Sequence, residues 1–96
     1  LAAIAVGTLA PAAQAGDPAA GKQKTATCMA CHGATGKATA PIYPNLAGQN
    51  EQYLIESIKA YQSGARNNPI MKPMVMSLSP ADVENIAAYY ASQRCP

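Results

Sequence analysis

The sequence predicts an all-α domain in which three main helices are joined by two long loops. Residues 50–64 and 79–90 repeat apolar residues at helical spacing, and both stretches are bounded by residues that begin or end helices. No stretch alternates apolar and polar residues as a half-buried strand would. Eight Pro and seven Gly indicate many turns, while 49% hydrophobic and 12% charged residues exclude an intrinsically disordered chain.

The expected core contains few large apolar rings. Of 96 residues, none is Trp or Phe and five are Tyr. A domain of this size lies near the lower limit at which apolar side chains alone hold a fold together, so we expect a non-protein group to complete the core. The formal net charge of +2 argues against nucleic acid as a partner.

Residues 1–15 are expected to be the remnant of a signal peptide, with its apolar region and cleavage site. Residues 1–13 are apolar or small apart from Thr8, and residues 13–15 have the A-x-A pattern of a cleavage site. An uncleaved anchor is the alternative, but these residues are fewer than the roughly 20 that span a bilayer. The sequence thus predicts one exported, soluble domain at residues 16–96, which in a bacterium lies in the periplasm.

The first helix of this domain is expected to start at Pro18, because Asp17 before it is a favoured N-cap. We expect it to run to Thr27 or Cys31. Residues 33–50 hold several Gly and Pro and no lasting periodicity, so they are predicted to form a loop. A loop of this length in so small a domain usually surrounds something.

The second helix is predicted from about Asn50 to Gly64, which is a typical helix stop. Its apolar positions follow one helical face: Leu54, Ile55, Ile58 and Tyr61. Residues 66–77 are expected to be irregular because Pro69 and Pro73 interrupt any regular helix.

The last helix has the clearest boundary signals in the chain. Ser79 is expected to cap it, Pro80 to take its first position, and Asp82 to complete a capping box. One apolar face then follows, formed by Val83, Ile86, Ala87 and Tyr90.

Residues 28–32 carry the chemistry. Their sequence, Cys-Met-Ala-Cys-His, is a C-x-x-C-H run, the attachment signature of a c-type haem. At the end of a helix Cys28 and Cys31 lie on one side, so each can form a thioether with one vinyl group of the same porphyrin. His32 then offers a ring nitrogen to the iron as the proximal axial ligand. One covalent haem c per chain would complete the core.

Other uses of the cysteines fit less well. A thioredoxin-like pair needs a neighbouring βαβ unit, for which the sequence has no strand pattern. A zinc site would have to recruit Cys95 from the far terminus and lacks the usual second ligand pair. A disulfide between Cys28 and Cys31 would be tight and would leave the core unsupported.

The chain has no second His, so a sixth iron ligand from the protein must be Met, Lys, Tyr or Cys. Residues 68–76 hold three of the four Met. Met29 lies between the two haem cysteines on the proximal side, and Met76 leads into the last helix, where we expect it to pack. Met71 and Met74 remain, and a thioether ligand would raise the reduction potential.

These features together resemble the small bacterial class I c-type cytochromes, most closely one haem-binding half of the dihaem periplasmic cytochromes c4. The likeness covers nearly all of residues 16–96. It rests on Gly21 seven residues before the first Cys, on the haem motif, and on the segments APIYPNLAGQ, QYLIESIKAYQSG, NPIMKPM and LSPADVENIAAYYASQ.

The resemblance implies the cytochrome c fold, with N- and C-terminal helices that cross at Gly21, wrapped around one haem. It implies that the Pro41 carbonyl, nine residues after His32, accepts a hydrogen bond from the imidazole. It also implies that the axial Met is the one seven residues before Leu78, which is Met71. Met74 would then form part of the haem-pocket wall.

The resemblance further implies a one-electron carrier, not an enzyme and without a small-molecule substrate, between a membrane cytochrome complex and a terminal oxidase or reductase. The alternatives are a haem sensor or enzyme with an open sixth position, or a module of a larger respiratory complex. Arg66 and Tyr53 are candidates for the haem propionates and equally for ordinary surface positions. Cys95 is left over, and in an oxidising compartment we expect it to be a free thiol or to link two copies as a disulfide homodimer.

Overall fold

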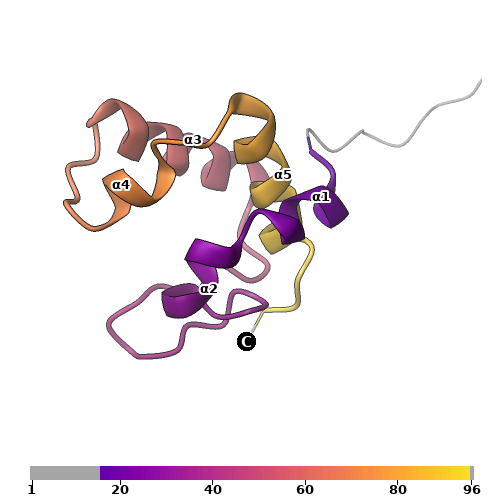
Figure 1. Ribbon diagram of the computed structural model, residues 1–96. Helices are drawn as coiled ribbons and strands as arrows, with labels where there is room; N and C mark the ends of the chain where they lie inside the picture. Colours follow the sequence, from indigo (N-terminus) through magenta and orange to yellow (C-terminus); the bar gives the residue numbers. More distant parts are fainter. Residues whose placement is uncertain (1–15, 96) are drawn as a thin grey trace, which may run out of the picture.

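Residues 16–95 are described in a computed structural model of the protein, and their regular secondary structure is entirely helical (Figure 1). Five helices follow one another along the chain: α1 (Pro18–Gln23), α2 (Ala26–His32), α3 (Glu51–Ser63), α4 (Met71–Val75) and α5 (Pro80–Ala91). The all-α prediction is therefore confirmed. The predicted signal peptide lies outside the described residues. None of the helices in this range is both long enough and apolar enough to cross a membrane.

The first predicted helix is in fact two helices, because the helix is interrupted at Thr25. Asp17 caps α1 as expected, its side chain accepting a hydrogen bond from the backbone N–H two residues on. At the break, the hydroxyl of the fully buried Thr25 donates to the carbonyl of Lys22 over 2.8 Å. Such a local bond competes with the hydrogen bonds of a continuous helix. Thr is also β-branched, which lowers its helix propensity. The chain therefore restarts as α2.

The predicted boundaries of the two long helices are confirmed. The side chain of Asn50 accepts from Tyr53 N over 2.9 Å at the start of α3, and Gly64 ends the helix with φ 86° in the left-handed region. At α5, the Ser79 hydroxyl accepts from Asp82 N, and the Asp82 carboxylate accepts from Ser79 N, each over 3.1 Å. Both caps depend only on residues close in sequence, which is why the sequence predicts them.

The expectation that residues 66–77 are irregular is wrong over Met71–Val75, which form α4. Pro73 is the third residue of this short helix. The N–H groups in the first turn of any helix have no carbonyl partner within it, so a Pro there removes no hydrogen bond. The loop around residues 66–77 thus contains one ordered turn that carries two methionines.

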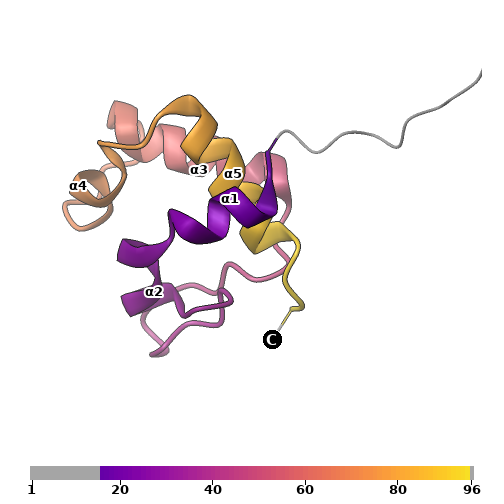
Figure 2. The ribbon, with the colours of Figure 1, turned by 45° about the vertical axis from the view of Figure 1, so that its right-hand side comes forward.

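Helices α1 and α5 cross in close contact, as the views in Figures 1 and 2 agree. Gly21 is buried at the crossing. A Cβ atom at this position would lie 1.8 Å from the carbonyl oxygen of Asn85 and 2.9 Å from the backbone nitrogen of Ile86. The crossing therefore requires a glycine, as the resemblance implied.

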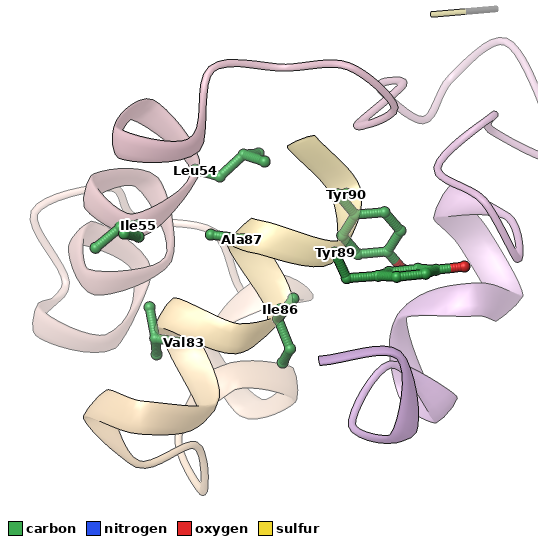
Figure 3. Packing of buried hydrophobic residues seen from close by; sticks show 7 residues of the cluster. All are labelled: Leu54, Ile55, Val83, Ile86, Ala87, Tyr89 and Tyr90. Carbon is green, nitrogen blue, oxygen red and sulfur yellow. The ribbon is translucent and has the colours of Figure 1, made fainter. Parts of the chain in front are cut away.

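The buried core lies between α3 and α5 and extends toward α2 (Figure 3). Leu54 and Ile55 of α3 face Val83 and Ala87 of α5 in this view. The members of the cluster are Leu54, Ile55, Val83, Ile86, Ala87, Tyr89 and Tyr90. Two tyrosines take the positions that Phe or Trp often occupies, and their ring centroids lie 5.2 Å apart.

Candidate haem-binding site

A cavity of about 460 Å³ opens beside this core. Residues of α2, α3, α4 and α5 line it, together with the loop between α2 and α3. Most of the lining side chains are apolar, a composition that suits a large, flat and mainly apolar group. The lining includes five predicted site residues: Cys28, Cys31, His32, Met71 and Met74.

Helix α2 positions the two cysteines and the histidine. Cys28 and Cys31 lie one helical turn apart, are half-buried and are not joined to each other. Burial raises the pKa of the Cys28 thiol, and the nearby Thr27 and Tyr90 hydroxyls oppose that effect. Both cysteines line the cavity with His32, so two thioether bonds and one iron ligand would come from a single helix.

The second contact of His32 differs from the expected one. His32 is 7% exposed, and its Nδ1 lies 3.0 Å from the carbonyl oxygen of Pro44, not of Pro41. Pro41 lies inside a turn that is closed by a hydrogen bond from Tyr43 N to Ala40 O. The chain returns to the imidazole only after this turn, so the prediction of Pro41 is wrong by one turn.

The Pro44 contact determines which ring nitrogen faces a metal. A carbonyl oxygen can only accept, so Nδ1 of His32 carries the proton in this contact. The other ring nitrogen, Nε2, then has a lone pair that could bind iron. A hydrogen bond of this kind fixes the orientation of the imidazole and raises its basicity as a ligand.

Helix α4 brings two thioethers to the same cavity. Met71 and Met74 are three residues apart on α4 and so share one helical face. Met71 is half-buried, whereas Met74 is 44% exposed. Met29 and Met76 do not line the cavity, so the structure brings together the two methionines that sequence reasoning retained.

Two polar groups in the lining also suit a haem. The Tyr90 hydroxyl is buried without a hydrogen-bond partner in the described residues, although the side chain is only 1% exposed. Burial, followed by the neighbouring Cys28, raises the pKa of this hydroxyl well above its ordinary value. Arg66 is the one cationic side chain among the described residues that line the cavity, and it stacks over the ring of Tyr61 at 4.5 Å. The residues present therefore fit an apolar macrocycle that carries anionic propionates.

The alternative sites find little support. Across residues 16–95 there is no group of three or more His, Cys, Asp or Glu side chains placed to share a metal ion, which argues against the zinc interpretation. Cys95 is exposed, and its sulfur packs against Gly48, away from the cavity lining.

Sequence reasoning missed three residues of this site: Pro44, Asn68 and Tyr90. Asn68 precedes Pro69, a combination that often begins a helix, and this signal was available. Tyr90 was assigned to the core face of α5, but nothing in the sequence reveals that its hydroxyl has no partner.

Comparison with known proteins identifies the family. The sequence model of the family described as cytochrome c matches residues 18–93. Cytochrome c-554(548) of Halomonas halodenitrificans is 56% identical over 82 residues, which cover 82% of this chain and 99% of that protein. Cytochrome c4 of Pseudomonas aeruginosa is 44% identical over 91 residues, covering 95% of this chain and 45% of its own length.

A solved structure agrees. Reduced recombinant cytochrome c4 from Pseudomonas stutzeri superposes with a TM-score of 0.80 at 42% identity, over 83% of this chain and 47% of that one. This chain therefore spans about half the length of the cytochromes c4 that it matches.

Proposed function

The chain belongs to the cytochrome c family, and from that premise we propose that it is a periplasmic one-electron carrier whose iron has His32 and Met71 as axial ligands. Its fold is the cytochrome c fold, and its cofactor is haem c, for whose attachment Cys28 and Cys31 form the C-x-x-C-H motif. The haem supplies an iron that alternates between the ferric and ferrous states. Its electron partners in this proposal are a membrane cytochrome complex and a terminal oxidase or reductase.

One observation carries the proposal: residues from two separate helices converge on one cavity. Helix α2 contributes the imidazole and both cysteines, and α4 contributes two thioethers. These helices lie apart in both views of Figures 1 and 2. Nitrogen on one side and sulfur on the other would occupy both axial positions, so a carrier with a closed iron is favoured over a site that binds a substrate.

Burial favours Met71 over Met74 as the ligand. An iron-bound thioether lies within the protein and is shielded from water, which suits the half-buried Met71. Met74 is 44% exposed and fits the rim of the pocket. The soft sulfur stabilises ferrous iron relative to ferric iron and so raises the reduction potential.

Two substitutions test this choice. Met71→Ala is expected to abolish the weak near-infrared sulfur-to-iron band of the ferric protein and to lower its reduction potential. Met74→Ala, the matched control on the same helical face, is expected to keep the band. If the two results are exchanged, the axial ligand is Met74 instead of Met71.

The rim of the cavity supports docking of a redox protein. Ile42 and Ile70 line the cavity and are 81% and 62% exposed. Exposed apolar side chains at the opening of a binding site are typical of a protein contact surface. A small net charge of +2 provides little long-range steering, so apolar contact would dominate the encounter.

The proposed periplasmic location rests on the sequence, and the proposed disulfide-linked dimer rests on Cys95. The A-x-A pattern at residues 13–15 supports export to the periplasm. The exposed thiol of Cys95 supports a disulfide between two copies. Such a pair would bring together two haem domains.

A further inference from the structure

Helix α4, which carries the proposed axial ligand, is too short to be stable alone. It has five residues, including Pro73. Isolated helices of fewer than roughly 12 residues are marginal in water, because the first turn fixes several residues for a single hydrogen bond. The position of Met71 therefore depends on contacts made by the rest of the protein.

The N-terminal end of α4 is held by Asn68. The side-chain oxygen of Asn68 accepts from Ile70 N and from Met71 N, each over 2.9 Å. The carbonyl of Asn68 also accepts from Lys72 N over 3.0 Å. These bonds are local, and Asn68 itself lines the cavity.

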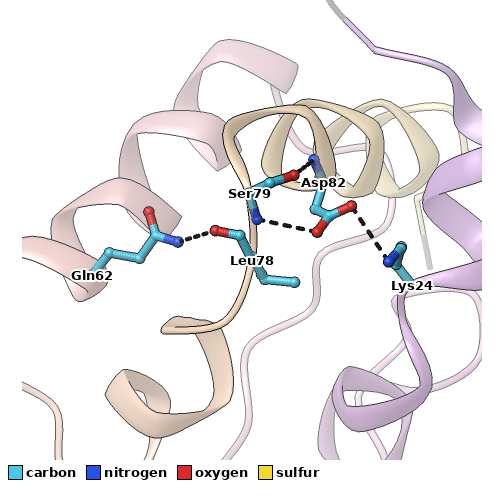
Figure 4. Close-up of polar contacts among 5 residues, drawn as sticks. All are labelled: Lys24, Gln62, Leu78, Ser79 and Asp82. Atoms are coloured by element: carbon cyan, nitrogen blue, oxygen red, sulfur yellow. Dashed lines mark hydrogen bonds and ion pairs between the residues drawn. The ribbon is translucent and has the colours of Figure 1, made fainter.

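The C-terminal end of α4 is held from another helix. Nε2 of Gln62, in the last turn of α3, donates to the Val75 carbonyl over 2.8 Å and to the Leu78 carbonyl over 3.1 Å. Figure 4 shows the second of these bonds. The N–H of Leu78 also donates to Val75 O over 3.1 Å, which closes the turn between α4 and α5.

The two acceptors of Gln62 lie at the two ends of the turn that follows α4. The last carbonyl groups of a helix have no partner within it, and Val75 is only 2% exposed, so little water reaches it. Leu78 packs against the core and lines the cavity. One carboxamide thus supplies both N–H groups to both ends of the same turn.

We propose that Gln62 is the positioning residue for the axial methionine, because its carboxamide fixes α4 to α3 and keeps the thioether on the iron. This inference rests on the proposed function, in which a methionine of α4 is the sixth ligand. Gln62 does not line the cavity and would not touch the haem. Its effect is on the fraction of molecules in which the ligand has left the iron.

The inference predicts a measurable change in ligand exchange. Imidazole binds ferric iron only after the methionine has left, so its apparent affinity is proportional to the open fraction. Loss of two net hydrogen bonds is expected to raise that fraction by on the order of tenfold. Imidazole affinity is then expected to rise by the same factor.

Two variants at this position separate the hydrogen bonds from side-chain size. Gln62→Ala removes both donors and the side chain, whereas Gln62→Glu keeps the size and places a carboxylate without a donor beside two carbonyl groups. Gln52→Ala is the matched control on the same helix, since within residues 16–95 the Gln52 side chain donates only to Glu56, over 3.1 Å at the exposed surface. We expect both Gln62 variants to gain affinity and the control to match the parent.

The test is an optical titration of the ferric holoproteins with imidazole, together with their thermal unfolding. If both Gln62 variants unfold at a lower temperature but keep the parent's imidazole affinity, the inference is overturned and the role of Gln62 is only structural. If Met71→Ala and Met74→Ala also bind imidazole with the parent's affinity, neither thioether occupies the iron. That result would overturn the proposed function instead.

Discussion

Replacement of Gly21 by Ala tests the packing on which the fold depends. Gly21 is buried where α1 crosses α5. The added Cβ would lie 1.8 Å from the Asn85 carbonyl oxygen, against about 3.4 Å for an ordinary contact. The obstructing atoms belong to the backbone of α5, so no side-chain rotation can relieve the clash, and the helices must separate by roughly 1.5 Å.

Two opposing effects set the change in the free energy of unfolding. Gly→Ala within a helix normally stabilises it by about 1 kcal/mol. Overpacking a tight contact costs about 1–3 kcal/mol, and a rigid backbone obstacle places this site at the upper end. We expect Gly21→Ala to lower the free energy of unfolding by about 2 kcal/mol, which for a domain of this size lowers the Tm by roughly 8–16 °C.

The assay is thermal unfolding of the holoprotein, followed by far-ultraviolet circular dichroism. Ala19→Gly is the control, because Ala19 is exposed on the same helix and its loss changes helix propensity alone. We expect it to cost no more than about 1 kcal/mol. The sign of the change in stability decides the outcome. If Gly21→Ala is as stable as the parent or more stable, the fold does not require the close crossing.

The remaining predictions concern a cap and a thiol. Hydrogen bonds from Ser79 and the nearby Lys24 hold the pKa of Asp82 below its ordinary value, so its contribution to stability is present above about pH 4 and is lost as the pH falls through that lowered pKa. Urea unfolding at neutral and acid pH is expected to show a smaller acid loss for Asp82→Asn, and equal losses would contradict this. Under non-reducing electrophoresis the parent is expected to form a dimer that Cys95→Ser abolishes, and a parent band only at monomer mass would exclude the disulfide.

The parts of the fold that the sequence predicts correctly are those fixed by near neighbours. Asp17, Asn50 and Ser79 each cap a helix through a backbone N–H group two or three residues away. The haem motif is similarly local, because residues 28–32 all lie in or at the end of one helix. Features of this kind depend only on residues a few positions apart, so they can be predicted from the sequence.

The features that were missed depend on contacts between distant segments. The C-terminal end of α4 is held by Gln62, whose two acceptors lie 13 and 16 residues further along the chain. The Pro44 carbonyl reaches His32 only after an intervening turn. Spacing along the sequence does not reveal where such a turn directs a carbonyl group.

The most direct test of a closed one-electron carrier is an optical redox titration of the holoprotein, performed with and without carbon monoxide. With His32 and a methionine of α4 on the iron, we predict one transition with a slope of about 59 mV per tenfold change in the ratio of oxidised to reduced protein. We also predict the same midpoint potential with and without carbon monoxide, because both axial positions of the ferrous iron would already be occupied. A midpoint that rises under carbon monoxide would show an open sixth position and contradict the account, in favour of a haem sensor or enzyme.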